Sequence, residues 1–224
     1  YSFAESNSDT MYAGGVNSFF LRSPDGGSTW EEVIETDWQY ISFRSMETFT
    51  DGTLIAAAGK EGVMKSENAG VTWEHLNSNL IATHVRKLKL DADGNLLAGT
   101  SQGFYRSDDG GETWERLGRP DMLPSIRSIA VLPSGRLFKG TTFLHISDDH
   151  GKTWRLADES LTARFIETIT VTDQNIVYIG NNKGEIFKSI DGGDTWQPLE
   201  TGLPNTQIRT IKSVKDSLLF VGTH

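Results

Sequence analysis

Apolar and polar residues alternate along most of this chain in short runs that are separated by Gly-containing turns. Val85–Leu90 reads Val-Arg-Lys-Leu-Lys-Leu, and a second apolar run at Leu96–Ala98 follows the turn at Asp93-Gly94. A third run, Gly103–Arg106, leads into a polar segment. A period of two residues is typical of β-strands with one buried face, so the pattern predicts an all-β protein of short antiparallel strands.

The same pattern returns about every forty residues, and each copy carries one polar segment that ends in Thr-Trp. Three apolar runs precede each polar segment, and a fourth begins at its Thr-Trp. Four antiparallel strands in a repeat of this length form one blade of a β-propeller. The segments are Ser23–Trp30, Ser66–Trp73, Ser107–Trp114, Ser147–Trp154 and Ser189–Trp196, with tryptophans 43, 41, 40 and 42 residues apart.

We therefore expect a single β-propeller of four-stranded antiparallel blades over residues 1–224, with blades at 1–36, 37–79, 80–119, 120–160 and 161–201. Residues 202–224 match the first two strands of a further blade, which gives five complete blades and half of a sixth. Because a half blade exposes strand edges, which native proteins avoid, we expect a segment of a longer propeller. The alternative is a closed five-bladed ring with a displaced tail.

Each polar segment has the composition of a tight turn between the third and fourth strands. Its Asp can accept hydrogen bonds from backbone N–H groups further along, and the following Gly supplies a conformation that a side chain would resist. The Trp can then pack between neighbouring blades. The carboxylates are one per blade, so we expect them to be structural and expect no metal site. These structural residues are Asp25, Asn68, Asp109, Asp149, Asp191, Trp30, Trp73, Trp114, Trp154 and Trp196.

These segments resemble the Asp-box, or BNR, repeat of sialidases, sortilin-type receptors, xyloglucan-cleaving endoglucanases and photosystem II assembly factors. The resemblance covers essentially the whole chain and implies the sialidase-like propeller fold rather than one activity. In those families the boxes lie on the face away from the usual ligand site. The resemblance also implies an extracellular, periplasmic or cell-surface protein, although the first residues show no signal-peptide pattern.

A column of charged residues marks the face opposite the boxes. The column lies eight residues before the turn that joins the first two strands of each blade, at Arg44, Arg86, Arg127, Glu167 and Arg209. Convergent guanidinium groups could bind an anion or a carboxylate, and the photosystem II assembly factors use an arginine-rich patch on their propeller. Alternatively, each Arg covers a strand end or pairs with an acidic neighbour in the next blade.

A second candidate for ligand binding lies in the loop before the second blade. Trp38 is the only Trp outside a box, and together with Asp37 and Tyr40 it resembles a sugar-stacking platform with polar edges. The alternative is that Trp38 packs one blade against the next.

Composition excludes several function classes. The net charge of −9 and the pI near 5.0 argue against nucleic-acid binding, because a phosphate backbone would be repelled on average. No apolar run has the length of a membrane span, so we expect no membrane insertion. The chain has no Cys, its five His are scattered, and it carries no phosphate loop or dinucleotide fingerprint, so we expect no cofactor.

Enzyme and binding functions make different demands on this scaffold. A sialidase needs an arginine triad, a Tyr–Glu pair and an acid/base Asp, and Phe43–Met46 only begins like the family's Phe/Tyr-Arg-Ile-Pro motif. An endoglucanase needs two carboxylates across a cleft, for which Asp37, Asp121 and Glu167 are candidates. We expect a non-catalytic propeller that binds a protein or glycan, as a monomer or part of a larger chain. The alternative is a glycoside hydrolase or a fragment of one.

Overall fold

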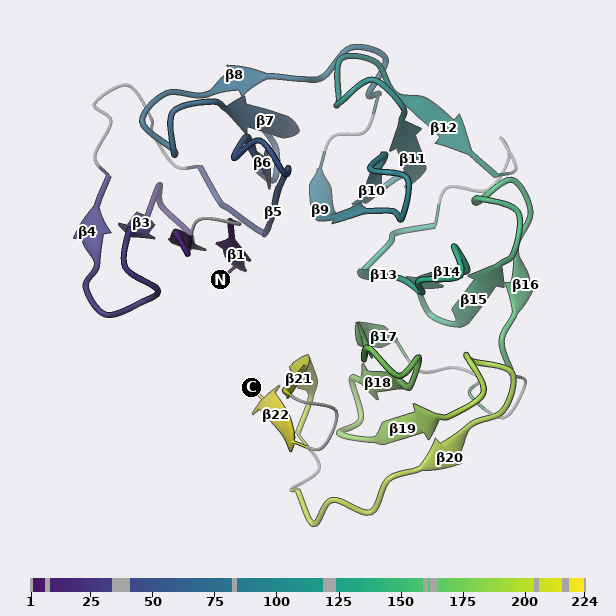
Figure 1. Cartoon of the computed structure of the whole chain (residues 1–224). Helices are drawn as coiled ribbons and strands as arrows, with labels where there is room; N and C mark the ends of the chain where they lie inside the picture. The colour runs from purple at the N-terminus through teal and green to yellow at the C-terminus, as the bar shows by residue number, and fades with distance from the viewer. Residues whose placement is uncertain are drawn as a thin grey trace. The chain divides into compact units, whose positions relative to one another are not determined.

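The computed structural model describes residues 2–6, 9–33, 41–81, 84–118, 124–158, 161, 165–203, 206–214 and 218–223. Its strands form six antiparallel sheets, five with four strands and one with two (Figure 1). Within each sheet, neighbouring strands follow one another in the chain. This confirms the predicted all-β propeller architecture of five complete blades and half of a further one. The chain divides into two units, Tyr1–Leu117 and Gly118–His224, which are described one at a time.

The first unit holds three blades. Blade 1 contains β1 (Ser2–Glu5), β2 (Met11–Gly14), β3 (Phe20–Ser23) and β4 (Glu31–Glu32). Blade 2 contains β5 (Ser45–Thr48), β6 (Leu54–Ala57), β7 (Val63–Ser66) and β8 (Glu74–His75). Blade 3 contains β9 (Val85–Leu90), β10 (Leu96–Thr100), β11 (Gly103–Ser107) and β12 (Glu115–Leu117). The first strands β1, β5 and β9 are neighbours, and β4, β8 and β12 lie at the other edge of their sheets (Figure 1).

The second unit holds two complete blades and a half blade. Blade 4 contains β13 (Ser128–Val131), β14 (Leu137–Gly140), β15 (Leu144–Ser147) and β16 (Arg155–Leu156). Blade 5 contains β17 (Ile166–Val171), β18 (Val177–Asn181), β19 (Ile186–Ser189) and β20 (Gln197–Pro198). The half blade contains β21 (Ile208–Val214) and β22 (Leu218–Thr223). Within the described residues, no helix is long and apolar enough to cross a membrane.

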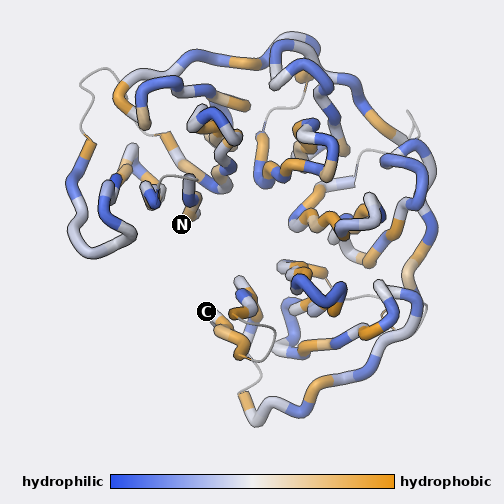
Figure 2. Tube along the Cα trace, in the orientation of Figure 1, coloured by the Kyte–Doolittle hydropathy of each residue, from blue (hydrophilic) through white to orange (hydrophobic). Residues whose placement is uncertain are grey.

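The core of each unit lies between neighbouring blades, because the second strands β6, β10, β14 and β18 are buried at every position and so pack on both faces. Elsewhere, hydrophilic residues are interspersed with hydrophobic ones (Figure 2). In the first unit, Phe20 of blade 1 packs against Phe43 and Trp73 of blade 2, with ring centroids 5.2 and 5.7 Å apart. In the second unit, Phe138 of blade 4 shares a buried cluster with Ile169 of blade 5. Burial of these side chains holds adjacent sheets together.

Backbone hydrogen bonds also join neighbouring blades. In blades 2, 3 and 5, an N–H at or just before the first strand donates to a carbonyl in the turn between the second and third strands of the preceding blade. Val85 N donates to Gly59 O at 3.0 Å in the first unit, and Ile166 N donates to Thr141 O at 3.0 Å in the second. These bonds fix the start of these first strands relative to the preceding blade.

Candidate functional site

The Asp boxes close the turn between the third and fourth strands with a repeated set of hydrogen bonds. In blade 3, Ser107 Oγ donates to Asp109 Oδ1 at 2.7 Å, and Gly111 N donates to Ser107 Oγ at 2.7 Å. Thr113 donates from its N–H to Asp109 Oδ1 at 2.9 Å and from its hydroxyl to Asp109 Oδ2 at 2.6 Å. The same four bonds occur at Asp25, Asp149 and Asp191.

The box of blade 2 keeps this geometry with an amide. Asn68 Oδ1 accepts the N–H of Thr72 at 2.8 Å and the hydroxyl of Ser66 at 2.9 Å. Asn68 Nδ2 donates to Thr72 Oγ1 at 2.7 Å, so one bond reverses its direction. The amide therefore closes the turn without a charge.

The threonine bonds lower the pKa of the box carboxyl groups. Hydrogen bonds from the Thr hydroxyl and N–H, and then from the Ser hydroxyl, lower the pKa of Asp25, Asp109 and Asp149 from 3.8 to about 2. The corresponding threonine and serine lower the pKa of Asp191 as well. Both oxygens of each carboxylate are occupied by the turn itself, so this geometry favours a structural role over proton transfer.

The two glycine positions of the box differ in how closely the preceding blade approaches them. The first position holds Ala69 in blade 2 and His150 in blade 4, with φ of 57° and 59°. The second position is Gly in all five boxes. A Cβ added at Gly193 would lie 2.5 Å from the ring of Phe138, and one added at Gly70 would meet the ring of Phe20. In these two boxes the second glycine therefore leaves space for an aromatic ring of the preceding blade, and Gly111 does the same for Leu76.

Box residues also form ion pairs with the preceding blade. Lys65 of blade 2 lies 2.7 Å from Glu74 and 3.7 Å from Glu112, the sixth box residue of blade 3. In the second unit, Arg136 of blade 4 lies 2.8 Å from Asp194, the sixth box residue of blade 5. A cation on one blade therefore faces an acid in the next blade's box.

The predicted charged column coincides with a backbone irregularity. In β9, β17 and β21, the pairing with the second strand shifts register at Arg86, Glu167 and Arg209, respectively. Each is the extra residue of a β-bulge, a feature that sequence reasoning missed and that redirects a side chain at a strand end.

The other two members of the column occupy equivalent positions. Arg44 N donates to Ala57 O at 2.9 Å, while Ser45 also faces Ala57. Arg127 N donates to Gly140 O at 2.8 Å, while Ser128 faces Gly140. In both blades two residues of the first strand oppose one residue of the second strand. All five column residues therefore occupy the same bulged position at the start of a first strand.

The side chains of the column have different surroundings. In the second unit, Arg127 Nη1 lies 2.8 Å from Glu167 Oε1, and its guanidinium lies 4.4 Å from the Phe165 ring centroid. This ion pair joins blades 4 and 5. It matches the alternative prediction that a column Arg pairs with an acidic residue in the next blade. Arg209 is exposed.

In the first unit, the two column arginines lie on neighbouring blades 2 and 3. Arg44 is exposed, and its Nε would lie 3.4 Å from a Cβ added at Gly59, so the guanidinium follows the β6–β7 turn. Arg86 is half-buried. No ion pair is described for Arg44 within the described residues of this unit.

The other predicted binding residues lie outside the described part of the chain. This applies to the proposed sugar platform of Trp38 and Tyr40, to Asp37 and to the candidate acid Asp121. Their roles stay predictions.

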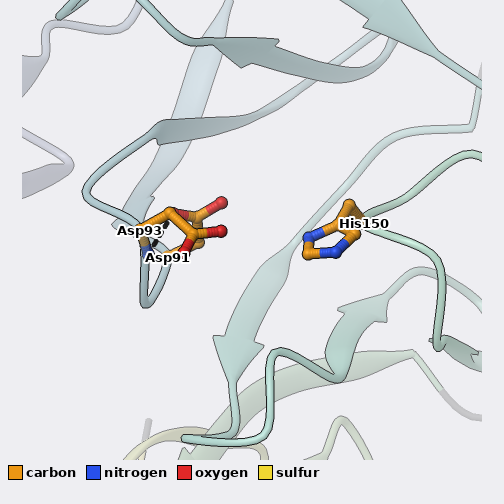
Figure 3. Close-up of side chains that lie close together, drawn as sticks. All are labelled: Asp91, Asp93 and His150. Atoms are coloured by element: carbon orange, nitrogen blue, oxygen red, sulfur yellow. Dashed lines mark hydrogen bonds between the residues drawn. The ribbon is translucent and has the colours of Figure 1, made fainter.

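Figure 3 draws two carboxylates of the β9–β10 turn, Asp91 and Asp93, together with His150. Asp91 Oδ1 accepts the N–H of Asp93 at 3.0 Å and that of Asn95 at 2.9 Å, so this carboxylate closes its own turn. His150 belongs to the second unit, where its ring lies beside Gly135. Two carboxylates of one turn supply too few oxygens for a cation, so we derive no metal centre from them.

Sequence reasoning also missed two titratable side chains that face each other across β14 and β15. Lys139 is only 8% exposed, and its Nζ lies 3.9 Å from the Trp154 ring centroid. Burial lowers the pKa of Lys139 from 10.5 to about 8. Burial, and then the charge of Lys139, lower the pKa of His145 from 6.5 to about 4. An alignment of the blades could have identified Lys139 as a charged residue at a buried position, because the equivalent residue of blade 5 is Ile179.

Four-stranded antiparallel blades that are each closed by this turn define a β-propeller with Asp-box repeats. The family model for the BNR/Asp-box repeat matches residues 105–116 and 145–156. No curated protein sequence matches this chain.

Solved structures share the fold at low sequence identity. A structure of YCF48 bound to D1 peptide has 20% identity and a TM-score of 0.76, and covers 98% of this chain and 73% of its own. YCF48 from Cyanidioschyzon merolae has 17% identity and a TM-score of 0.70, and covers 98% and 78%. The GH74 xyloglucanase from Xanthomonas campestris has 18% identity and a TM-score of 0.69, and covers 89% and 38%.

Proposed function

We propose that this chain is a non-catalytic binding propeller that recognises a protein or glycan at the strand ends opposite its Asp boxes. An anionic group of the ligand contacts the column arginines of one unit, either Arg44 and Arg86 in the first or Arg209 in the second. The observation that carries the proposal is the bulge at the start of the first strands of blades 2 to 5 and of the half blade, because it gives every column residue the same backbone setting.

The net negative charge of the protein makes the column arginines important for binding an anionic ligand. The chain carries a net charge of −9, so an anionic ligand is repelled on average and needs a local cation to attract it. Guanidinium groups hold carboxylates or phosphates through two parallel hydrogen bonds, and Arg44 and Arg209 are both exposed. Arg127 contributes less, because Glu167 already neutralises it.

The similar folds support the protein-binding form of this proposal. One structurally similar YCF48 was solved bound to a D1 peptide, so a propeller of this fold can hold a peptide. The glycan-binding form rests on Trp38 and Tyr40. We also propose a location outside the cytoplasm or at a cell surface, which fractionation of the native host with detection of the protein would test.

A binding screen with matched variants tests the proposal. The wild-type protein is presented to a glycan array and to a library of acidic peptides. The ligand that binds is then titrated against Arg44→Ala/Arg86→Ala and against Arg209→Ala. We expect one of these variants to weaken binding by about tenfold or more, since charge-assisted hydrogen bonds are lost. Arg155→Ala, which removes the same charge on the box side, is the control and should bind like the wild type.

Two results would overturn the proposal. The first is a ligand whose affinity none of the column variants changes, which would make the column structural. The second is release of product from xyloglucan or from a fluorogenic sialoside, which would establish the glycoside hydrolase alternative.

A further inference from the structure

Lys139 occupies a position of the second strand that is apolar in all the other blades. It pairs with Ile129 of β13 on one side and with His145 of β15 on the other. The residues at the equivalent position of the other second strands are Ala13, Ala56, Ala98, Ile179 and Val221. A lysine at this position needs a physical reason, because the burial of a charge without a partner reduces stability.

The amine of Lys139 is held against apolar groups rather than against an acid. The side chain is only 8% exposed, and among the described residues of the second unit no ion pair is described for it. Its Nζ lies 3.9 Å from the Trp154 ring centroid. Burial lowers the pKa of Lys139 from 10.5 to about 8, so part of the amine is uncharged at pH 7. An uncharged lysine amine is a nucleophile, whereas an ammonium group is not.

His145 keeps the surroundings of this amine uncharged. Directly opposite residues of neighbouring strands lie on the same face of a sheet, so the imidazole lies beside the lysine. Burial, and then the charge of Lys139, lower the pKa of His145 from 6.5 to about 4, and the ring is therefore neutral at pH 7. A neutral imidazole beside the amine does not hold it in the ammonium form, as a carboxylate would.

The row of side chains that contains Lys139 and His145 reaches solvent at its outer end. His145 pairs with Leu156 of β16, the outermost strand of the blade, and Leu156 is 45% exposed. Phe143, whose ring centroid lies 6.4 Å from that of His145, is 36% exposed. Apolar side chains therefore lie between the amine and water, and they favour a small uncharged molecule over an ion.

We propose that Lys139 is a nucleophilic lysine that binds a small, uncharged aldehyde by forming an imine. The lone pair of Nζ forms a bond with the carbonyl carbon, both amine protons move to the carbonyl oxygen, and this oxygen leaves as water when the C=N bond forms. The apolar surroundings favour the uncharged imine. This site uses none of the column arginines.

Trapping of the imine identifies the lysine that reacts first. The whole protein is incubated at pH 7 with propionaldehyde and cyanoborohydride, which reduces an imine to a stable propylamine, and mass spectrometry of peptides locates the label. We expect Lys139 to be labelled about tenfold faster than the exposed Lys152 and Lys183, because burial increases the neutral fraction of its amine. Glyceraldehyde, whose hydroxyl groups disfavour burial, is the matched probe and should label Lys152 and Lys183 faster than Lys139.

Two glutamate substitutions test the role of the surroundings. His145→Glu places a carboxylate opposite the amine and stabilises the ammonium form, so labelling of Lys139 by propionaldehyde should fall by about tenfold. His150→Glu makes the same change at an exposed His of the box and should leave this labelling unchanged. Lys139→Arg keeps the charge and removes the nucleophile, so its peptide should carry no label. Circular dichroism melts confirm that the variants fold.

Two results would overturn this inference. If propionaldehyde labels Lys139 no faster than Lys152 and Lys183, the buried amine is only a packing residue. If His145→Glu is labelled at Lys139 like the wild type, the uncharged surroundings do not set its reactivity. Neither result bears on the column arginines, which are tested with different variants and ligands.

Discussion

The carboxylate of Asp109 is bonded on both oxygens by a single threonine, and this small ring of contacts recurs at Asp25, Asp149 and Asp191. The bonds need the ionised form, because a proton on either oxygen would remove an acceptor. The stability of each turn that is closed by a box Asp therefore depends on pH. Asn68 is exempt, because its amide does not titrate.

This link predicts a specific acid sensitivity. The pKa of Asp109 is about 2 in the folded chain and 3.8 without these bonds, so its contribution is complete above 3.8 and is lost as the pH falls towards 2. Asp109→Asn should lower the melting temperature slightly at pH 7 and reduce the further loss between pH 4 and pH 2. Melts across this range measure both effects.

Asp93→Asn is the control for this prediction. The same charge is removed from an exposed turn, so the acid dependence should match that of the wild type. A wild-type acid dependence in Asp109→Asn would show that the box carboxylate adds nothing to pH-dependent stability.

Lys139 should also make stability rise with pH, but in the alkaline range and because burial disfavours its charged form. Burial lowers its pKa to about 8 in the folded chain, whereas the unfolded chain keeps 10.5. The folded state therefore binds fewer protons between these values, and stability should rise as the pH increases from about 8. Lys139→Met should raise the melting temperature at pH 7 and flatten the rise between pH 8 and pH 9.5. A lower melting temperature at pH 7 would mean that the contact with Trp154 outweighs burial.

At the scale of the element, the box is a turn with two glycine positions that have different structural roles. The first adopts a left-handed conformation with no contact closer than 3.4 Å to an added Cβ, and Ala69 and His150 adopt the same conformation. The second combines positive φ with the ring or aliphatic side chain of the blade before it. Strain and crowding therefore add at the second position only.

Neighbouring substitutions in the box of blade 5 separate these two effects. Gly193→Ala should reduce the free energy of unfolding by about 2–4 kcal/mol, since φ is +95° and the ring of Phe138 lies in the way. Gly192→Ala, at φ +70° with its closest neighbour 3.4 Å away, should cost about 1 kcal/mol. Urea unfolding curves give both values. Equal losses would contradict a role for packing.

The elements differ in how far sequence alone could predict them. Strands and boxes were predictable because alternation and turn composition are local properties of the chain. The bulge at Arg86 was not, because it depends on how Val85 bonds to the blade before it. The Arg127–Glu167 ion pair could not be predicted for a similar reason, since spacing along the chain does not say which side chains from adjacent blades are in contact.

At the scale of the whole molecule, stability in a repeat protein is approximately the sum of blade stabilities and contacts between neighbours. The chain forms two units, each with its own buried clusters. A defect between two blades should therefore weaken its own unit most.

Gly193→Ala provides the test of this idea. Hydrogen exchange should show a larger loss of protection in residues 118–223 than in residues 2–117, because the altered contact lies between blades 4 and 5. Gly70→Ala, between blades 1 and 2, should give the reverse pattern. An equal loss throughout the chain in both variants would show that the whole protein unfolds as one cooperative body.

The contact between a box glycine and the ring of the preceding blade also bears on how such chains grow. Phe20 meets Gly70, Leu76 meets Gly111 and Phe138 meets Gly193, so a complete blade such as blade 2 carries both a glycine that leaves space for the blade before it and an apolar side chain that fills the space in the blade after it. A gene duplication that copies one whole repeat then inserts both halves of this contact together. The number of repeats could change during evolution without any compensating substitution in the flanking copies.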